Sequence, residues 1–240
     1  MTITSSHNTK LKELRKLHQR RQRGLAGRFV AEGEDLLAAA DTAGWEPVER
    51  YCAAGSGLPG TEVESRLLDQ ASALGSGTRT LAVYGQRWAP AATGPLCVYL
   101  HGVHDPGNVG TILRSADAFG ASCVAIGPGT ADPYGPKAVR ASMGAVFTVA
   151  LVRADGIREL PGSTVALVAD RGVPLPELAL GEYTPDGVSL LIGAEREGLP
   201  DAIVSAAGHV ARIPIANHSL NAAMAATVAL YETTRMARES

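Results

Sequence analysis

Residues 96–126 decide the fold, and they read LCVYLHGVHDPGNVGTILRSADAFGASCVAI. The stretch begins with an apolar run and ends with a second one at Cys123–Ile126. Between the two runs, Val109, Ile112 and Ala116 follow the spacing of a helix. Apolar strands joined through a helix are typical of a parallel sheet that helices cover on both faces.

The same alternation continues to the carboxyl end of the chain. Short apolar runs rich in β-branched residues predict six strands, at Leu96–Val103, Cys123–Ile126, Ala145–Leu151, Thr164–Ala169, Val188–Gly193 and Val210–Ile215. An alanine-rich segment that ends near Met236 predicts the last helix. We therefore expect an α/β domain with a parallel sheet over residues 96–240.

The residues before this domain predict a smaller α/β domain. We expect a basic helix first, and then strands and helices at Arg28–Gly33, Glu34–Ala43, Val48–Ala53, near Thr61–Leu74, and Arg79–Tyr84. Residues 86–95 (QRWAPAATGP) concentrate prolines, a glycine and small residues, as linkers do. The expected division is a domain at 1–85, a linker at 86–95 and a domain at 96–240.

The composition is that of a globular protein. Of the 240 residues, 45% are apolar and 19% are charged, which excludes fibrous and low-complexity classes. We find no apolar window long enough for a bilayer span and no apolar signal core at the polar, then basic, start, so we expect a cytoplasmic protein without a membrane partner. Cys52, Cys97 and Cys123 are odd in number and widely spaced, which predicts reduced core thiols.

Positive charge is concentrated in the first 30 residues. The net charge of the whole chain is only −2, yet this block holds one acid, Glu13, against eight cations: Lys10, Lys12, Arg15, Lys16, Arg20, Arg21, Arg23 and Arg28. Such a block suits a polyanion, since Lys and Arg that neutralise phosphates release counterions. It equally suits a solvated amphipathic helix, because Leu11, Leu14 and Leu17 recur every three residues and would pack one face.

Three loops that follow apolar strands carry the candidate site residues, since parallel sheets bind ligands at the carboxyl ends of their strands. In the first loop, His104–Gly120, Arg114 lies outside the apolar helical stripe, where a guanidinium can hold a phosphate. The second, Gly193–Gly198 (GAEREG), fits either a structural turn or a backbone approach to a ligand. In the third, Ile213–Asn221, Ser219 can cap the following helix.

The third loop also groups four hydrogen-bonding side chains, Asn217, His218, Ser219 and Asn221, which would suit a ligand with several polar edges. Other chemistries lack their motifs. The chain has no G-x-G-x-x-G, no P-loop and no G-x-S-x-G elbow. His101 and His104 have no further ligands at zinc spacing, so we expect no metal site.

These loops, in this order, resemble the three sequence motifs of the SpoU/TrmH family of RNA ribose 2'-O-methyltransferases, within the SPOUT class. The matching segments are HDPGNVGTILRSADAFG (104–120), LLIGAEREGL (190–199) and IPIANHSLNAAMAATVALYE (213–232). Residues 132–149 resemble the family's segment after its second strand, and residues 1–84 resemble its small substrate-binding domain. In one departure, Ile215–His218 is about two residues shorter than is common in the family, within a loop, where chain lengths vary.

The resemblance implies an S-adenosylmethionine-dependent enzyme that methylates a ribose 2'-hydroxyl in RNA. Ribosomal RNA is the first choice of substrate, and transfer RNA is the alternative. The resemblance also implies a deep trefoil knot in the C-terminal domain and a homodimer whose active sites are completed across the interface. The residues that match the family's catalytic positions are Arg114, Asn108, Glu195, Ser219 and Asn221. Those that match its cofactor-lining positions are Gly193, Ile213 and Leu220.

We assign RNA capture to the N-terminal block, namely Lys10, Lys12, Arg15, Arg20, Arg21, Arg23 and Arg28. The main alternative is a non-catalytic RNA-binding or ribosome-assembly protein of the same fold. A complete set of five catalytic matches argues against it, since a binding module has no need of all five. An enzyme that methylates a small molecule or a protein is a more distant alternative, and the basic block argues against that one.

Overall fold

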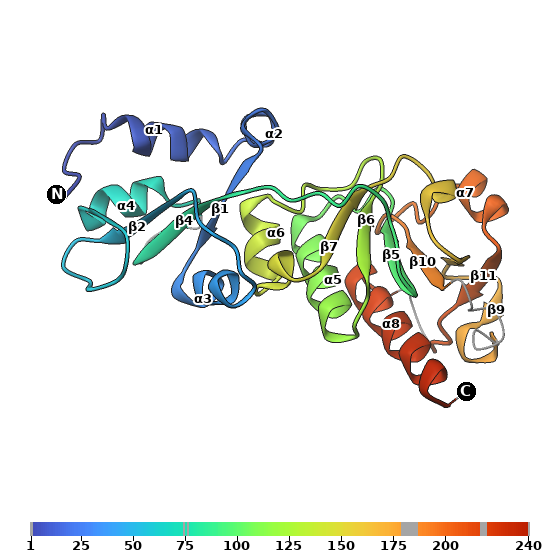
Figure 1. Ribbon diagram of the computed structural model, residues 1–240. Helices are drawn as coiled ribbons and strands as arrows, with labels where there is room; N and C mark the ends of the chain where they lie inside the picture. The colour runs from blue at the N-terminus through green and yellow to red at the C-terminus, as the bar shows by residue number, and fades with distance from the viewer. Residues whose placement is uncertain (1, 74, 76, 179–186, 217–219, 240) are drawn as a thin grey trace.

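A computed structural model describes residues 2–73, 75, 77–178, 187–216 and 220–239. The molecule is elongated, with a four-stranded sheet at the N-terminal end and a seven-stranded sheet at the C-terminal end (Figure 1). The predicted α/β class, with a large parallel sheet preceded by a smaller α/β unit, is confirmed.

The smaller sheet has the order β1-β4-β2-β3, with β4 antiparallel to both β1 and β2 and with β3 parallel to β2. Its strands are β1 (Arg28–Glu32), β2 (Glu49–Ala53), β3 (Thr61–Val63) and β4 (Thr80–Gly85). The helices around it are α1 (Thr9–Lys16), α2 (Arg20–Ala26), α3 (Glu34–Thr42) and α4 (Ser65–Ala71). As the three-residue spacing predicts, Leu11, Leu14 and Leu17 are buried, and they pack on this sheet together with α4.

The larger sheet is parallel throughout and has the order β7-β6-β5-β10-β8-β11-β9. Its strands are β5 (Leu96–Leu100), β6 (Cys123–Ile126), β7 (Ala150–Arg153), β8 (Ser163–Leu167), β9 (Val173–Pro174), β10 (Val188–Ile192) and β11 (His209–Arg212). Its helices are α5 (Pro106–Ala118), α6 (Pro136–Ala141), α7 (Asp201–Ala206) and α8 (Ala222–Glu239), with short 3-10 helices at η1 (Ala145–Phe147), η2 (Ile157–Glu159) and η3 (Leu175–Glu177).

Strand residues alternate between two apolar layers. Val98 and Leu100 of β5 pack with α5 and α8 on one face, whereas Cys97 and Tyr99 pack on the other face with residues of α7. Both faces are covered, which explains why the central strands β5 and β10 are buried along their whole length. Cys52, Cys97 and Cys123 are buried free thiols, as the sequence predicts.

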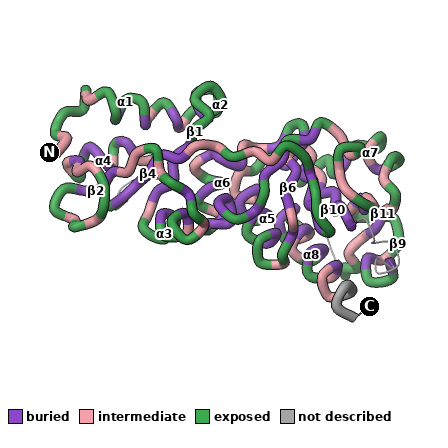
Figure 2. The backbone as a smooth tube through the Cα atoms, in the orientation of Figure 1, coloured by how far each residue is buried: buried purple, intermediate pink, exposed green. Residues whose placement is uncertain are grey.

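One core joins the two sheets. Phe29, Trp45 and Tyr84 of the smaller unit interlock with Tyr134 and Phe147 of the larger one, at ring-centroid distances of 4.6 to 6.0 Å. The indole Nε1 of Trp45 donates to the carbonyl of Phe147 at 2.8 Å. Buried backbone positions accordingly run from the smaller sheet into the larger one (Figure 2).

Three local predictions are wrong, and one strand was not predicted. The expected basic helix is two helices, because the carbonyls of Leu17 and His18 accept from Arg23 Nη1, at 2.8 Å each, instead of continuing a helix. Residues 61–63 form a strand that pairs with β2, and the helix expected there begins only at Ser65. Residues 145–147 form a 3-10 turn after Gly144, whose φ is 101°, and the short strand β9 at Val173 was not expected.

None of the helices in the described part of the chain is long and apolar enough to cross a membrane. The trefoil knot stays a prediction.

Candidate active site at the carboxyl edge of the parallel sheet

The order of the strands creates a crevice between β5 and β10. From β5 the chain moves outward through β6 and β7, then crosses to β8, and later inserts β10 beside β5. Neighbouring strands whose connections leave in opposite directions form the switch point at which open parallel sheets bind ligands. Leu100 and Ile192 pair at the ends of these two strands, so the loops that follow them meet at this point.

The first loop leads into α5 through a well-defined helix cap. Asp105 Oδ1 accepts from the backbone N–H groups of Gly107 at 2.6 Å and Asn108 at 3.2 Å, and Pro106 occupies the first turn. The cap satisfies donors that the helix leaves free. It also fixes Asn108 at the start of α5, with its side chain toward the loop after β10.

Three of the predicted catalytic residues form one hydrogen-bonded chain. Asn221 Nδ2 donates to Asn108 Oδ1 at 3.0 Å, and Asn108 Nδ2 donates to Glu195 Oε1 at 2.7 Å. The Asn221 Oδ1 atom accepts from the backbone N–H of Ala223 at 2.8 Å, and this bond fixes the orientation of the Asn221 amide. The two amide donors of this hydrogen-bonded series therefore point from the start of α8 toward the Glu195 carboxylate, which is exposed.

Beside this chain lies a cleft of about 450 Å³, a volume within the range of small-molecule sites. All three predicted cofactor-lining residues, Gly193, Ile213 and Leu220, line it, together with Glu195. Further walls come from the loop after β8, residues 167–171. This loop is not among the three predicted from the sequence, although the apolar run before it was a usable signal.

Glycine is required at the mouth of the cleft for a packing reason. A Cβ atom at Gly193 would lie 2.2 Å from the backbone carbon of Gly198 and 2.3 Å from the nitrogen of Leu199. The loop folds back on itself, because Ala194 and Gly198 exchange backbone hydrogen bonds of 3.1 and 3.0 Å. The structural interpretation of this loop is therefore compatible with the ligand interpretation, because the close turn shapes the wall of the cleft.

The cleft suits S-adenosylmethionine in both chemistry and size. Ile192, Ile213 and Leu220 offer apolar contact for an adenine ring, and the glycine-rich loop offers backbone groups without side chains. Glu195 places a negative charge where a sulfonium or ammonium group would be stabilised. In the described residues, no group of three or more His, Cys, Asp or Glu side chains could hold a metal ion.

Arg114 lies apart from the hydrogen-bonded chain. It is exposed on α5, six residues after Asn108 and so about 9 Å further along the helix axis. Among the described residues it has no hydrogen-bond or ion-pair partner. Ser219, like Asn217 and His218, lies outside the described residues, and the capping that the sequence assigned to Ser219 is done by Asn221.

The basic N-terminal block divides into exposed and buried members. Lys10, Lys12, Arg20, Arg21 and Arg28 are exposed, and Arg15 is partly exposed.

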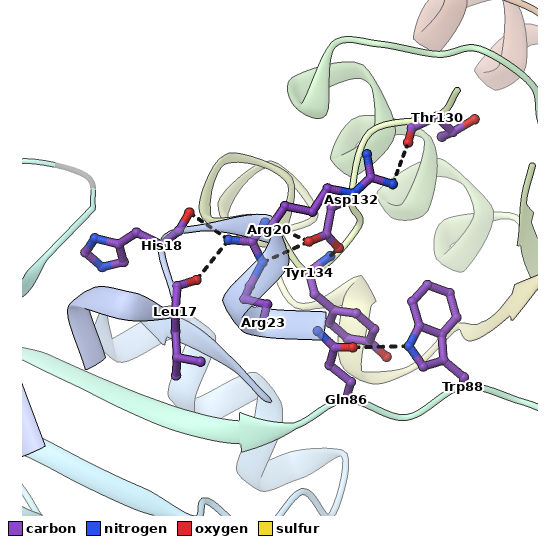
Figure 3. Close-up of polar contacts among 9 residues, drawn as sticks. All are labelled: Leu17, His18, Arg20, Arg23, Gln86, Trp88, Thr130, Asp132 and Tyr134. Carbon is purple, nitrogen blue, oxygen red and sulfur yellow. Dashed lines mark hydrogen bonds and ion pairs between the residues drawn. The ribbon is translucent and has the colours of Figure 1, made fainter. Parts of the chain in front are cut away.

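Arg23 is an exception, and its assignment to RNA is wrong. Only 4% of Arg23 is exposed, and its guanidinium forms an ion pair of 2.6 Å with Asp132 in addition to its two carbonyl contacts (Figure 3). With its donors used inside the protein, it ties the smaller unit to the larger one.

Comparison with known proteins places this geometry in a family. The SpoU rRNA Methylase family matches residues 95–231, and the MRM3-like substrate binding domain matches residues 8–84. The chain is 30% identical to the 23S rRNA (guanosine(2553)-2'-O)-methyltransferase RlmP of Bacillus subtilis, over 95% of this chain and 97% of that protein.

Solved structures agree along nearly the whole length. The AdoMet-bound rRNA methyltransferase from Sinorhizobium meliloti is 31% identical, with a TM-score of 0.86 and coverage of 98% of this chain and 97% of that one. The SpoU methyltransferase AviRb from Streptomyces viridochromogenes, in complex with AdoMet, is 26% identical, with a TM-score of 0.84 and coverage of 98% and 99%. The family match over more than half of the chain, with a hydrogen-bonded site at its switch point, shows that the protein belongs to the SpoU rRNA methylase family.

Proposed function

We propose that the protein transfers the methyl group of S-adenosylmethionine to the 2'-hydroxyl of one ribose in 23S ribosomal RNA. The observation that carries this proposal is the chain Asn221–Asn108–Glu195 at the rim of the cleft. When bound, S-adenosylmethionine supplies an electrophilic methyl group next to these residues. The names of two relatives, one of them matched along nearly its whole length, support ribosomal RNA as the acceptor.

A ribose hydroxyl is a poor nucleophile, so positioning carries much of the catalysis. In our mechanism Asn108 and Asn221 orient the ribose, Ser219 assists them, and Glu195 keeps the Asn108 amide in one rotamer. Arg114 stays protonated and cannot act as a base. Its guanidinium binds a neighbouring RNA phosphate and polarises the hydroxyl, and the phosphate shares the proton that the hydroxyl gives up.

The test is transfer of a labelled methyl group from S-adenosylmethionine to 23S rRNA that lacks its own modifications. We expect label in wild type, its loss in Arg114→Ala and in a substrate with a 2'-deoxy target nucleotide, and a large loss in Arg114→Lys, which cannot form paired guanidinium bonds. Arg66→Ala is the matched control, because Arg66 has a side chain that is 74% exposed and lies far from the cleft in the fold. Full turnover in Arg114→Lys would contradict the role of Arg114, and label in transfer RNA alone would contradict the substrate.

We further propose a homodimer in which Arg114 serves the partner's site. On α8, Met224, Val228 and Tyr231 recur at helical spacing and are 61%, 40% and 54% exposed. This face continues onto α5, because Ser115 and Thr227 are hydrogen-bonded at 2.6 Å and the rings of Phe119 and Tyr231 are in contact. An exposed apolar stripe beside an unpaired arginine suits an interface with a second copy of the chain.

Sedimentation tests the dimer. Val228→Glu places a charge in the centre of the stripe, and we expect monomers that bind S-adenosylmethionine but transfer no methyl group. Glu232→Gln, on the same helix, is the control, and a monomeric wild type would contradict the proposal.

The exposed cations of the N-terminal block support RNA capture. Deletion of the block would remove Leu11 and Leu14 from the core, so substitution is the cleaner test. Lys12→Ser, Arg21→Ser and Arg28→Ser together should weaken RNA binding and reduce its salt slope by roughly 0.7 for each phosphate that the protein no longer neutralises. An unchanged salt slope would show that the block is only the solvated face of an amphipathic helix and does not bind RNA. A cytoplasmic location stays a prediction from the sequence.

A further inference from the structure

A second cleft lies where the two units of the protein meet. Its volume is about 300 Å³, and residues from four separate segments line it: α2, the connection after β4, the loop after β6 and the loop after β7. The floor is the loop Gly127–Gly129. A Cβ atom at Gly127 would lie 2.5 Å from the hydroxyl of Tyr99, so the packing beneath requires this part of the floor to be free of side chains.

The second cleft is at the same edge of the sheet as the candidate active site. Gly102 lies between a lining residue of the first cleft, Ala194, and one of the second, Gly129. A Cβ atom at Gly102 would lie 3.4 Å from the Cβ of Ala194 beside the first cleft, and a Cβ atom at Gly129 would lie 3.3 Å from the Cα of Gly102. From β6 to β8 the sheet spans three strand spacings, or roughly 14 Å, so the clefts are close enough for one RNA strand to reach both.

The side chains around the second cleft suit a nucleotide. The Arg153 guanidinium lies over the Trp88 ring, 4.4 Å from its centroid, and Trp88 Nε1 donates to Gln86 Oε1 at 3.3 Å (Figure 3 shows the contact between Gln86 and Trp88). The Trp88 ring also meets Tyr134 in a T-shaped contact, with the two ring centroids 5.3 Å apart. An exposed arginine guanidinium that lies over an aromatic ring can offer a planar group on which an unpaired base stacks.

The charge of the cleft favours a phosphate. Asp132 is neutralised by Arg23 at 2.6 Å, which leaves Arg20 and Arg153 against the single exposed acid Asp155 among the lining residues. Arg20 makes one long bond, from Nη2 to the carbonyl of Thr130 at 3.4 Å, so most of its donors stay available (Figure 3). Arg153 has no ion-pair partner in the described part of the chain.

We propose that this cleft, between Trp88 with Arg153 on one side and Arg20 on the other, binds one unpaired nucleotide of the substrate RNA near the methylated one. The base stacks on the guanidinium of Arg153, and Arg20 holds the adjoining phosphate. The site rests on the proposed function for its RNA, and it would select substrates by requiring an unpaired base at a fixed distance from the acceptor ribose. The sequence alone could not reveal it, because its walls come from four distant segments of the chain.

The fluorescence of Trp88 gives a readout that does not depend on methyl transfer. The chain has only two tryptophans, so Trp45→Phe leaves Trp88 as the sole reporter. The probes are the four ribonucleoside 5'-monophosphates and a mixed-sequence eight-residue oligoribonucleotide, titrated without S-adenosylmethionine. If Trp45→Phe does not fold by circular dichroism, ultraviolet crosslinking of the oligonucleotide to the wild-type chain, with mass spectrometry of the crosslinked peptides, replaces the titration.

We expect saturable quenching, tighter for the oligonucleotide than for any mononucleotide. Arg153→Ala and Arg20→Ala should each weaken it at least about fivefold, the lower end of what one stacked base contributes. Arg158→Ala is the matched control, because Arg158 is an exposed cation that does not line the cleft. Absence of quenching and crosslinking, or affinity unchanged in both cleft variants, would overturn the proposal, as would a mononucleotide that binds as tightly as the oligonucleotide.

The same variants separate this proposal from the proposed function. If quenching occurs but no RNA is methylated, the nucleotide site stands and the activity fails. If 23S rRNA is methylated equally by wild type, Arg20→Ala and Arg153→Ala, the activity stands and the nucleotide site fails.

Discussion

The Asn221 amide has two functions in the structure. Its oxygen caps α8 through the N–H of Ala223, and its nitrogen donates to Asn108. A cap of this kind contributes about 1 kcal/mol to stability, and here it also fixes the direction of the donors that lead to Glu195. Stability and site geometry are therefore coupled at this residue.

Gly193 offers a sharp test at the scale of one residue. Gly193→Ala would place a methyl group 2.2 to 2.5 Å from the backbone of Gly198 and Leu199, so the turn must open. We expect the affinity for S-adenosylmethionine to fall at least about tenfold, or about 1.4 kcal/mol, measured by isothermal titration calorimetry. Gly85→Ala, which meets no atom within 4 Å, is the control, and an unchanged affinity in Gly193→Ala would show that the turn does not shape the cleft.

His18 predicts a pH dependence of stability. Burial lowers the pKa of His18 from its ordinary value of 6.5, with Glu32 opposing the shift, and its Nε2 atom is buried without a partner among the described residues. The unfolded chain therefore binds more protons than the folded one, and stability falls as the pH drops below about 6.5, the ordinary pKa. Urea unfolding from pH 8 to pH 5 should show a smaller fall in His18→Gln than in wild type, whereas parallel curves would contradict the assignment.

At the scale of the element, α5 carries two of the residues to which the proposed chemistry is assigned, Asn108 and Arg114. Its first turn presents Asn108 to Glu195, and its outer face presents the exposed Arg114, next in sequence to Ser115, which is hydrogen-bonded to Thr227 of α8. The sequence predicted this helix because the spacing of its apolar residues can be seen within one short segment of the chain. The spacing also placed Arg114 off the buried stripe, and Arg114 is indeed exposed.

The cap of α5 can be separated from the chemistry that it supports. Asp105→Ala removes the acceptor for Gly107 and Asn108, which should cost about 1 kcal/mol of stability and lower kcat by loosening Asn108. Affinity for S-adenosylmethionine should stay unchanged, because Asp105 does not line the first cleft. Asp105→Asn should restore both stability and kcat, and a kcat that does not recover would show that the charge of Asp105, rather than the cap, is what matters.

At the scale of the whole molecule, the two units are packed as one body. They share the aromatic core around Phe29 and Phe147, and the hydroxyl of Tyr134 donates to the carbonyl of Arg87 at 2.5 Å. Burial raises the pKa of Tyr134 to about 12, so this hydroxyl keeps its proton at neutral pH. The proposed RNA-binding surface and the proposed methyl-transfer site are therefore held at a fixed distance.

The Arg23–Asp132 ion pair should be important for this arrangement. Removal of one partner leaves the other charge buried, so Asp132→Asn should lower the free energy of unfolding by roughly 3 kcal/mol in urea. Glu13→Gln breaks an exposed pair with Lys16 and should cost less than about 1 kcal/mol. Equal losses in the two variants would show that Arg23 does not tie the units together.

The sequence by itself determined the strands of the larger sheet other than β9 and the start of β7, the loops that carry polar residues and the basic N-terminal surface, because periodicity, caps and charge runs are local properties. Only the tertiary structure joined Asn108 to Glu195 and Asn221, which lie 87 and 113 residues further along the chain. It also buried Arg23 against Asp132, 109 residues away, and formed the second cleft. These contacts depend on which strands become neighbours, and that order is decided by packing of the whole core.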